Sequence, residues 1–259
     1  MIIRIVELYN YREMIFSLVK RELRGKYKAS FLGFLWSFIN PLFQLVVYTI
    51  VFSFIMRSGI ENFAIFLFVG LIPWNFFSMS VSNGAACVIN QQNLVKKIYF
   101  PRLVLPISYV TSMFVNMLLT FIVIFAVLIF SRHGINIYAI QFLPLVMIIE
   151  YILALGFCML VSSITVYFRD LEYILGIVNM AWMYLTPILY TTDMIPEELR
   201  VIFDLNPMTP VVLAYQQILY YKQPPELETL MHAAVVGLVI FGLGVFVFEK
   251  IQRKFVEEL

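Results

Sequence analysis

The stretch Leu103–Phe130 reads LVLPISYVTSMFVNMLLTFIVIFAVLIF and contains no charged residue. A helix of roughly 20 apolar residues is long enough to cross the hydrocarbon core of a bilayer. The stretch is continuously apolar rather than alternating, which favours a helix over a strand of a membrane barrel. It therefore predicts an all-α integral membrane protein.

The composition of the whole chain points the same way. Of its 259 residues, 62% are hydrophobic and 13% are charged, and the mean hydropathy is +0.89. Soluble domains are typically about 45–50% apolar and about 25% charged. A soluble enzyme and a disordered chain are therefore disfavoured. The net charge of +2 gives no basic surface for nucleic acid, so we expect no nucleic-acid partner.

Five further stretches are similarly apolar, so the sequence predicts six transmembrane helices. The predicted spans are about Phe31–Met56, Phe63–Ile89, Leu103–Phe130, Tyr138–Phe168, Ile174–Tyr190 and Leu230–Phe248. The fourth is long enough to be tilted or kinked near Pro144. These spans make residues 31–259 one transmembrane domain.

Residues 1–30 predict an amphipathic helix that lies along the membrane surface. Its apolar positions recur at helical spacing, at Leu8, Tyr11, Ile15, Leu18 and Val19. The alternative is a short helix packed on the rest of the protein.

Residues 192–228 predict a loop that re-enters the membrane. Within it, residues 201–221 are moderately apolar but contain Asp204, Asn206, Pro207 and Pro210. A spanning helix would leave backbone groups unsatisfied at the prolines, whereas two short helices facing a water-filled path would not. We expect Asn206, Pro207 and Pro210 to form a gate on the outer side.

Basic residues set the predicted orientation. Fourteen of the eighteen lysines and arginines fall before the first span, in the 91–102 loop, at Arg169 or in the C-terminal tail. Such residues gather on the cytoplasmic side. Both termini are therefore expected in the cytoplasm.

The sequence shows no catalytic constellation. It contains neither a G-x-x-x-x-G-K-[ST] loop nor an H-E-x-x-H motif, and its two histidines, His133 and His232, are far apart. Cys87 and Cys158 lie in apolar surroundings and are expected to be buried. Glu150 is the acid placed well inside a span, either as a structural hydrogen-bonding group or as a functional one. We expect no catalytic, cofactor-binding or metal-binding residue in this chain.

A series of short motifs resembles the type-2 ABC permeases that export polysaccharides. In chain order these motifs are Gly33–Leu42, Gly70–Ser78, Asn93–Arg102, Arg169–Leu171, Thr186–Tyr190 and Asn206–Pro210. The set covers nearly the whole chain and is most similar to the O-antigen exporter permeases. The resemblance implies a homodimer with two separate ABC ATPase subunits, which bind the ATP and Mg²⁺. It also implies export of a lipid-linked polysaccharide.

Several site residues follow from the residues together with this resemblance. The loop 91–102 is expected to hold an ATPase-coupling helix, with Asn93 as its cap and an apolar side made by Leu94, Val95 and Ile98. The coupling residues are Asn93, Leu94, Val95, Lys96, Lys97, Ile98, Tyr99 and Phe100. The alternative is a loop whose basic residues merely bind lipid headgroups.

The spans that line the path in the family suggest substrate-channel aromatics, whose faces can stack on sugar rings. The candidates are Trp36, Phe43, Phe77, Trp182 and Tyr184. Arg24, Lys26 and Lys28 are expected to attract the pyrophosphate of the lipid carrier, or to serve as ordinary membrane anchors. Alternative functions are export of teichoic acid or capsule, transport of a drug or small lipid, and a membrane scaffold.

Overall fold

The computed structural model describes residues 2–27, 35–51, 60–131 and 133–259. These residues form helices and turns, and no strand occurs among them, which confirms the all-α prediction for this part of the chain. The longer helices are α2 (Arg12–Tyr27), α3 (Trp36–Tyr48), α4 (Phe63–Ser82), α6 (Val104–Phe130), α8 (Leu143–Thr165), α9 (Leu171–Tyr184), α11 (Met208–Leu219) and α12 (Leu227–Ile251). The shorter helices are α1 (Ile2–Asn10), α5 (Gln92–Lys97), α7 (Ile137–Ile140), α10 (Arg200–Leu205) and α13 (Phe255–Glu258).

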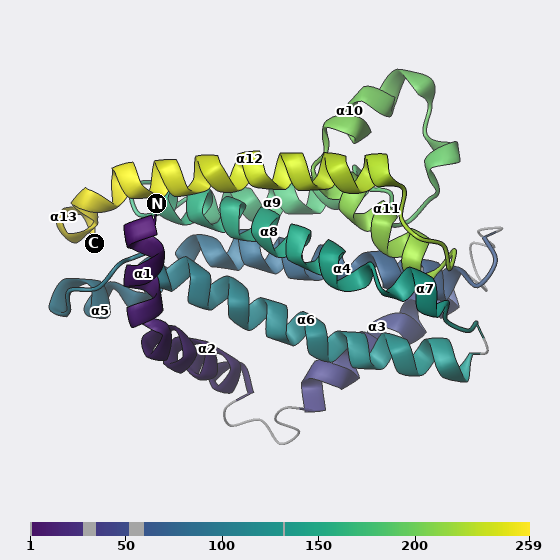
Figure 1. Ribbon diagram of the computed structural model, residues 1–259, viewed down its shortest axis with the longest axis horizontal. Coiled ribbons are helices and arrows are strands. Elements are labelled where there is room, and N and C mark those ends of the chain that lie inside the picture. The colour runs from purple at the N-terminus through teal and green to yellow at the C-terminus, as the bar shows by residue number, and fades with distance from the viewer. Residues whose placement is uncertain (1, 28–34, 52–59, 132) are drawn as a thin grey trace.

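The long helices form an elongated bundle. Helices α4, α6, α8, α9 and α12 run along its length, and α3 is inclined to them (Figure 1). Helix α5, helix α13 and both chain termini lie toward one end, which we call the α5 end (Figure 1). Helices α7 and α10 lie toward the opposite end, the α10 end.

Four helical stretches are long and apolar enough to cross a membrane. They are Phe63–Ala86, Val104–Phe130, Ile137–Thr165 and Leu227–Lys254, and they match the second, third, fourth and sixth predicted spans. Neighbouring protein buries 78% and 67% of the most apolar windows of the first and third stretches, but 33% and 22% of the other two. Helices α4 and α8 therefore form the interior, whereas α6 and α12 keep apolar faces suited to lipid.

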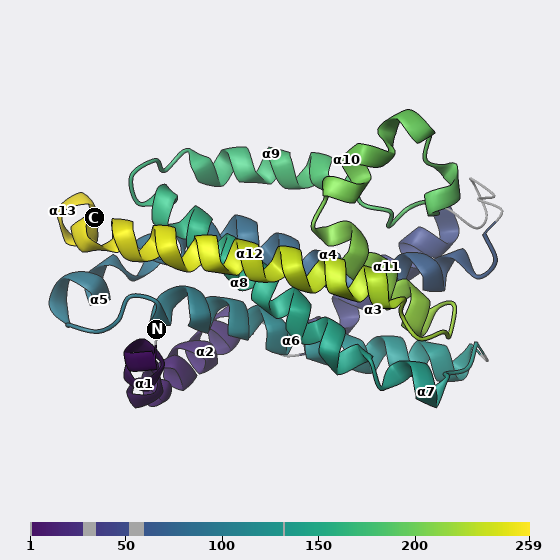
Figure 2. The same cartoon turned by 45° about the horizontal axis from the view of Figure 1, so that its top comes forward.

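The other two predicted spans are shorter in the structure. Around α3 an apolar helical stretch covers Phe38–Val51, and the flanks of this predicted span fall in residues 28–34 and 52–59, outside the described residues. Helix α9 has 14 residues and ends at Tyr184, so it is about 21 Å long. It lies at the edge of the bundle (Figure 2). The six-span architecture stays a prediction.

The fourth predicted span is broken. Helix α7 ends at Ile140, and α8 begins at Leu143 with Pro144 in its first turn. Proline is tolerated there because the amide it lacks would have no partner within the helix. The two-residue break lies where the sequence predicts a tilt or kink, near Pro144.

Glycines let α8 and α12 approach closely. A Cβ atom on Gly244 would collide with the carbonyl oxygen of Gly156, and one on Gly156 would lie 2.7 Å from the backbone of Phe241. Small residues of this kind permit the close backbone contact that membrane helices use for packing. Cys87 and Cys158 are buried free thiols within the core, as predicted.

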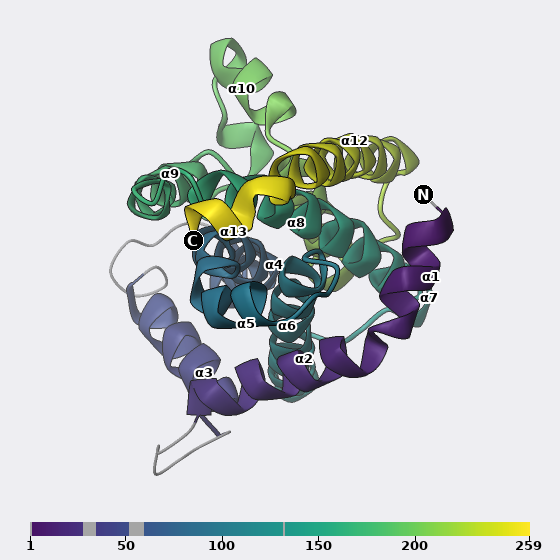
Figure 3. The same cartoon turned by 90° about the vertical axis from the view of Figure 1, so that its left-hand side faces the viewer.

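The N-terminal helices lie across the bundle rather than along it (Figure 3). Leu18 and Val19 of α2 are buried, and Leu8, Tyr11 and Ile15 pack against the core. The predicted apolar face therefore contacts protein, which agrees with the alternative of a helix packed on the bundle. Position on a membrane surface stays a prediction.

The segment 192–228 leaves the bundle and returns to it. After the short turns Thr192–Met194 and Glu197–Leu199, helix α10 ends at Leu205 and α11 begins at Met208. Helix α10 projects from the α10 end, and α11 packs beside α12 and α4 (Figure 1). Two short helices joined at Asn206–Pro207 agree with the sequence, while re-entry into a membrane stays a prediction.

Candidate functional site

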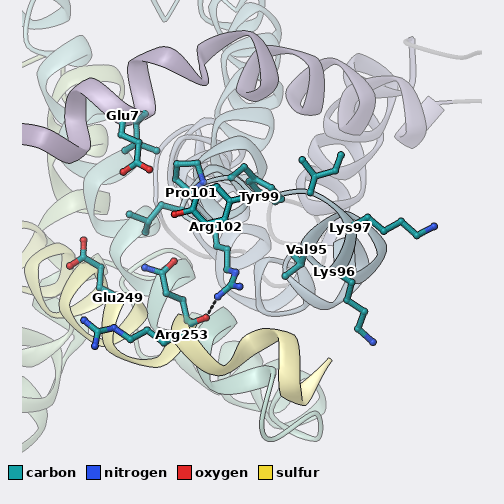
Figure 4. A pocket seen from close by; sticks show the side chains of 14 residues that line it. Glu7, Val95, Lys96, Lys97, Tyr99, Pro101, Arg102, Glu249 and Arg253 are labelled. Carbon is teal, nitrogen blue, oxygen red and sulfur yellow. Dashed lines mark hydrogen bonds between the residues drawn. The ribbon is translucent and has the colours of Figure 1, made fainter.

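A pocket of about 460 Å³ opens at the α5 end (Figure 4). The loop that follows α5 forms one wall, α1 contributes Glu7 and Leu8, and the end of α12 contributes Glu249. The Arg102 guanidinium donates a hydrogen bond to the backbone carbonyl of Gln252 and lies 5.9 Å from the ring centre of Phe255. Arg102 therefore fixes the loop after α5 to the C-terminal tail.

The tip of this loop is an exposed apolar pair. Ile98 is 55% exposed and Tyr99 is 90% exposed, while Val95 and Phe100 on either side are buried. Lys96 and Lys97 are exposed and point away from the pocket (Figure 4). We call Ile98 and Tyr99 the loop tip. Two exposed apolar side chains beside two lysines suit contact with another protein.

The helix in this loop differs from the one predicted. It spans Gln92–Lys97, so Asn93 is inside it and is not its cap. Ile98 has an extended backbone, with φ −130° and ψ 136°, so the helix ends before it. Of the predicted apolar side, Leu94 and Val95 pack against the protein, whereas Ile98 is exposed.

Asn206 joins α9 to the start of α11. Its amide nitrogen donates to the carbonyl of Leu185 at 2.8 Å and to the hydroxyl of Thr186 at 2.9 Å. Its amide oxygen accepts from the indole of Trp182 at 2.8 Å and from the backbone of Met208 at 2.9 Å. Pro207 precedes α11, and Pro210 lies in its first turn. Of the three predicted gate residues, Asn206 thus fixes the turn and the prolines shape it.

Helix α11 extends from this turn to the α10 end. Its 12 residues measure about 18 Å. At its far end the Tyr220 hydroxyl donates to the carbonyl of Glu61, just before α4 begins. Burial, followed by the neighbouring Tyr221 and Glu61, raises the pKa of Tyr220, so its hydroxyl stays a protonated donor. The Asn206 turn and the Tyr220 contact with Glu61 therefore lie at opposite ends of α11, about 18 Å apart along that helix.

Glu150 holds α11 against α8. The Tyr215 hydroxyl donates to Glu150 Oε2 at 2.6 Å, and both side chains are fully buried. Glu150 Oε1 has no hydrogen-bond partner in the described part of the protein. This contact matches the structural reading of Glu150.

The five predicted channel aromatics lie apart. The ring centres of Phe77 and Trp182 are 5.1 Å apart, and both rings pack with Phe157 inside the bundle. Phe43 is 65% exposed and Tyr184 is 59% exposed, on α3 and α9. Trp36 lines a separate groove between α3, α4 and α6.

The predicted pyrophosphate-binding residues are described only in part. Arg24 is exposed near the end of α2. Lys28 lies outside the described residues, as does the side chain of Lys26.

Two features were missed in the sequence. Arg102 and Gln252 are 150 residues apart, so no local pattern announces their bond. The groove beside Trp36 is lined by polar side chains, and their spacing in the sequence indicates it. Asn40 and Gln44 are four residues apart, and so are Asn116 and Thr120. That spacing puts each pair on one helix face.

The amino-acid sequence of this chain is similar to those of known transport proteins. The ABC-2 type transporter family model matches residues 13–220. An O-antigen export system permease protein of Myxococcus xanthus is 37% identical over 99% of this chain and 100% of that protein, and one of Klebsiella pneumoniae is 32% identical over 95% of each. The polysialic acid transport protein of Escherichia coli is 24% identical over 90% of this chain and 91% of that protein. This chain belongs to the ABC-2 type transporter family.

Proposed function

We propose that this chain is the permease subunit of an ABC exporter that moves a lipid-linked polysaccharide, similar to O-antigen, across the inner membrane. The observation that carries the proposal is similarity along 99% of the chain to a protein named as an O-antigen export permease. Capsule export is the second candidate, since the polysialic acid transport protein is similar over 90% of the chain.

A separate ATPase supplies the energy. The sequence has no phosphate-binding loop, so ATP and Mg²⁺ bind to the partner. The working unit is a homodimer of this chain with two ATPase subunits. The permease itself is then a transporter component and not an enzyme.

The loop tip is the ATPase contact. Ile98 and Tyr99 protrude from the α5 end, and Arg102 ties their loop to the C-terminal tail, which continues from α12. A displacement of the loop tip is therefore transmitted to the start of α6 and to the end of α12. This connection provides a route from closure of the ATPases to movement of the spans.

The α5 end faces the cytoplasm, and six spans cross the membrane. Lys96, Lys97 and Lys254 are exposed at the α5 end, in keeping with the bias of basic residues toward the cytoplasm. In this orientation the Tyr220 end of α11 faces the outer side, and the Asn206 turn lies up to about 18 Å inward from it, within a core of about 30 Å. This depth supports a re-entrant gate at Asn206, Pro207 and Pro210.

The lipid carrier binds on the cytoplasmic side. Arg24 and Lys26 lie in the last turn of the crosswise helix α2, and Lys28 follows in the sequence, before the first predicted span. Exposed Phe43 and Tyr184 belong to the faces of α3 and α9 that a second copy of the chain would meet. The path for the glycan runs along α3 and α9, beside the place where the two copies meet.

Co-purification tests the proposal. The wild-type permease should retain its ATPase, and ATP hydrolysis by the complex should rise when lipid-linked glycan is added. The double variant Ile98→Asp/Tyr99→Asp should lose most of the bound ATPase. Ile137→Asp/Tyr138→Asp is the matched control, because this Ile-Tyr pair is also exposed but lies at the α10 end. Equal ATPase retention by both double variants would place the contact elsewhere.

A further inference from the structure

A groove of about 260 Å³ lies between α3, α4 and α6. Its polar lining comes from Asn40 and Gln44 of α3, Asn75 and Ser78 of α4, and Asn116 and Thr120 of α6. Trp36, Phe68 and Phe76 are the aromatic part of its wall. Three helices thus direct amides toward one space beside aromatic rings.

The groove lies at the middle of the membrane-spanning helices. Helix α6 begins at Val104, and the lining residues Met113–Thr120 follow it by 9 to 16 residues. At 1.5 Å per residue they lie about 14 to 24 Å along a helix that crosses a core of about 30 Å. Lipid headgroups do not reach this depth.

Amides at this depth are costly unless they have partners. Gln44 has a long contact with the Tyr48 hydroxyl, at 3.4 Å. Asn40 and Asn75 are exposed, and the described part of the protein supplies no hydrogen-bond partner to either side chain. Asn75 is the exposed residue in an otherwise buried run, Gly70–Phe77. Polar groups inside a membrane protein commonly mark the path of a substrate.

The lining selects the class of ligand. The groove has no Asp, Glu, Lys or Arg among its described lining residues, which disfavours a pyrophosphate or another ion. Amides carry both donors and acceptors and so match hydroxyl groups, which also do both. Aromatic faces carry negative charge and attract the polarised C–H bonds of a sugar ring. The volume suits one ring rather than several.

We propose that this groove is a binding subsite for one uncharged sugar ring of the glycan in transit. The proposal rests on the proposed export function. Asn40 and Asn75 bind the ring hydroxyls from two helices, and Trp36 or Phe76 contacts its face. Because α6 lines the groove and follows the loop that carries Ile98 and Tyr99, sugar binding also reports glycan occupancy to the ATPase contact.

ATP hydrolysis by the permease–ATPase complex in lipid nanodiscs tests the subsite. The probe is lipid-linked glycan extracted from cells that lack this permease, and the sugar-free lipid carrier is its control. For Asn40→Leu/Asn75→Leu we expect the half-maximal glycan concentration to rise about tenfold, as for the loss of two ordinary hydrogen bonds. Gln141→Leu, an exposed amide outside the groove, should leave it unchanged.

A second measurement does not depend on the leucine variants. Alkylation of Asn75→Cys, in a chain lacking Cys87 and Cys158, should slow severalfold with glycan and not with the sugar-free carrier. An unchanged half-maximal concentration in the double leucine variant, or equal protection by the sugar-free carrier, overturns the subsite alone. Absence of any glycan stimulation in the wild-type complex overturns the proposed export function and the subsite with it.

Discussion

Asn206 uses all four hydrogen-bonding positions of its side chain, two as donor and two as acceptor. Asn206→Ala would leave the Trp182 indole and the Leu185 carbonyl without partners inside the bundle. We expect a loss of about 1–3 kcal/mol in the free energy of unfolding. Thermal unfolding in detergent measures it, with Gln141→Ala as the exposed control. A change no larger than that of the control would contradict the anchoring role.

The hydrogen bond between Tyr215 and Glu150 leads to a second prediction for single residues. Glu150→Gln keeps an acceptor for the Tyr215 hydroxyl and adds a donor, so export and stability should stay near wild type. Tyr215→Phe leaves the buried carboxyl group unpaired and should cost about 1–3 kcal/mol. Export of surface glycan and thermal unfolding are the two measurements. Loss of export in a stable Glu150→Gln protein would show that the carboxyl group itself is needed.

At the scale of elements, the close contact between α8 and α12 depends on Gly244 of α12. Gly242, on the same helix, does not take part in this contact. A Cβ atom added to Gly244 would collide with Gly156, whereas a Cβ atom added to Gly242 would meet no atom within 4 Å. Gly244→Ala should therefore destabilise the protein, whereas Gly242→Ala should be neutral or gain up to about 1 kcal/mol from helix propensity. Unfolding of the two variants, compared side by side, measures the difference. Equal effects would mean that the helices are not this close.

The elements also show where sequence reasoning succeeds. Long uninterrupted runs such as Leu103–Phe130 predicted α4, α6, α8 and α12, because a helix is the simplest way to satisfy the backbone in lipid. Short elements were predicted less well. Helix α5 begins and ends elsewhere than expected, since Leu94 and Val95 pack against the bundle. Residues such as Ile98 cannot be assigned to an inner or an exposed face from a six-residue pattern. The candidate site shares this limit, because Arg102 and Asn206 act through partners distant in the sequence.

At the scale of the whole molecule, the proposed orientation predicts which end of the protein a reagent outside the cell can label. Single cysteines at Gln223 and Glu257, in a background lacking Cys87 and Cys158, can be tested with a membrane-impermeant thiol reagent. Gln223 follows α11 at the α10 end, and Glu257 is in α13 at the α5 end; both are exposed. We expect labelling of Gln223→Cys in intact cells with a permeabilised outer barrier. Labelling of Glu257→Cys under the same conditions would overturn the six-span topology.

The central claim is that this chain carries glycan out of the cell, and deletion of the chain tests it most directly. Polysaccharide at the cell surface should disappear from the deletion strain, while lipid-linked glycan accumulates inside. The wild-type chain and Ile137→Asp/Tyr138→Asp should restore surface polysaccharide, and Ile98→Asp/Tyr99→Asp should not. Unchanged surface polysaccharide in the deletion strain would contradict the account.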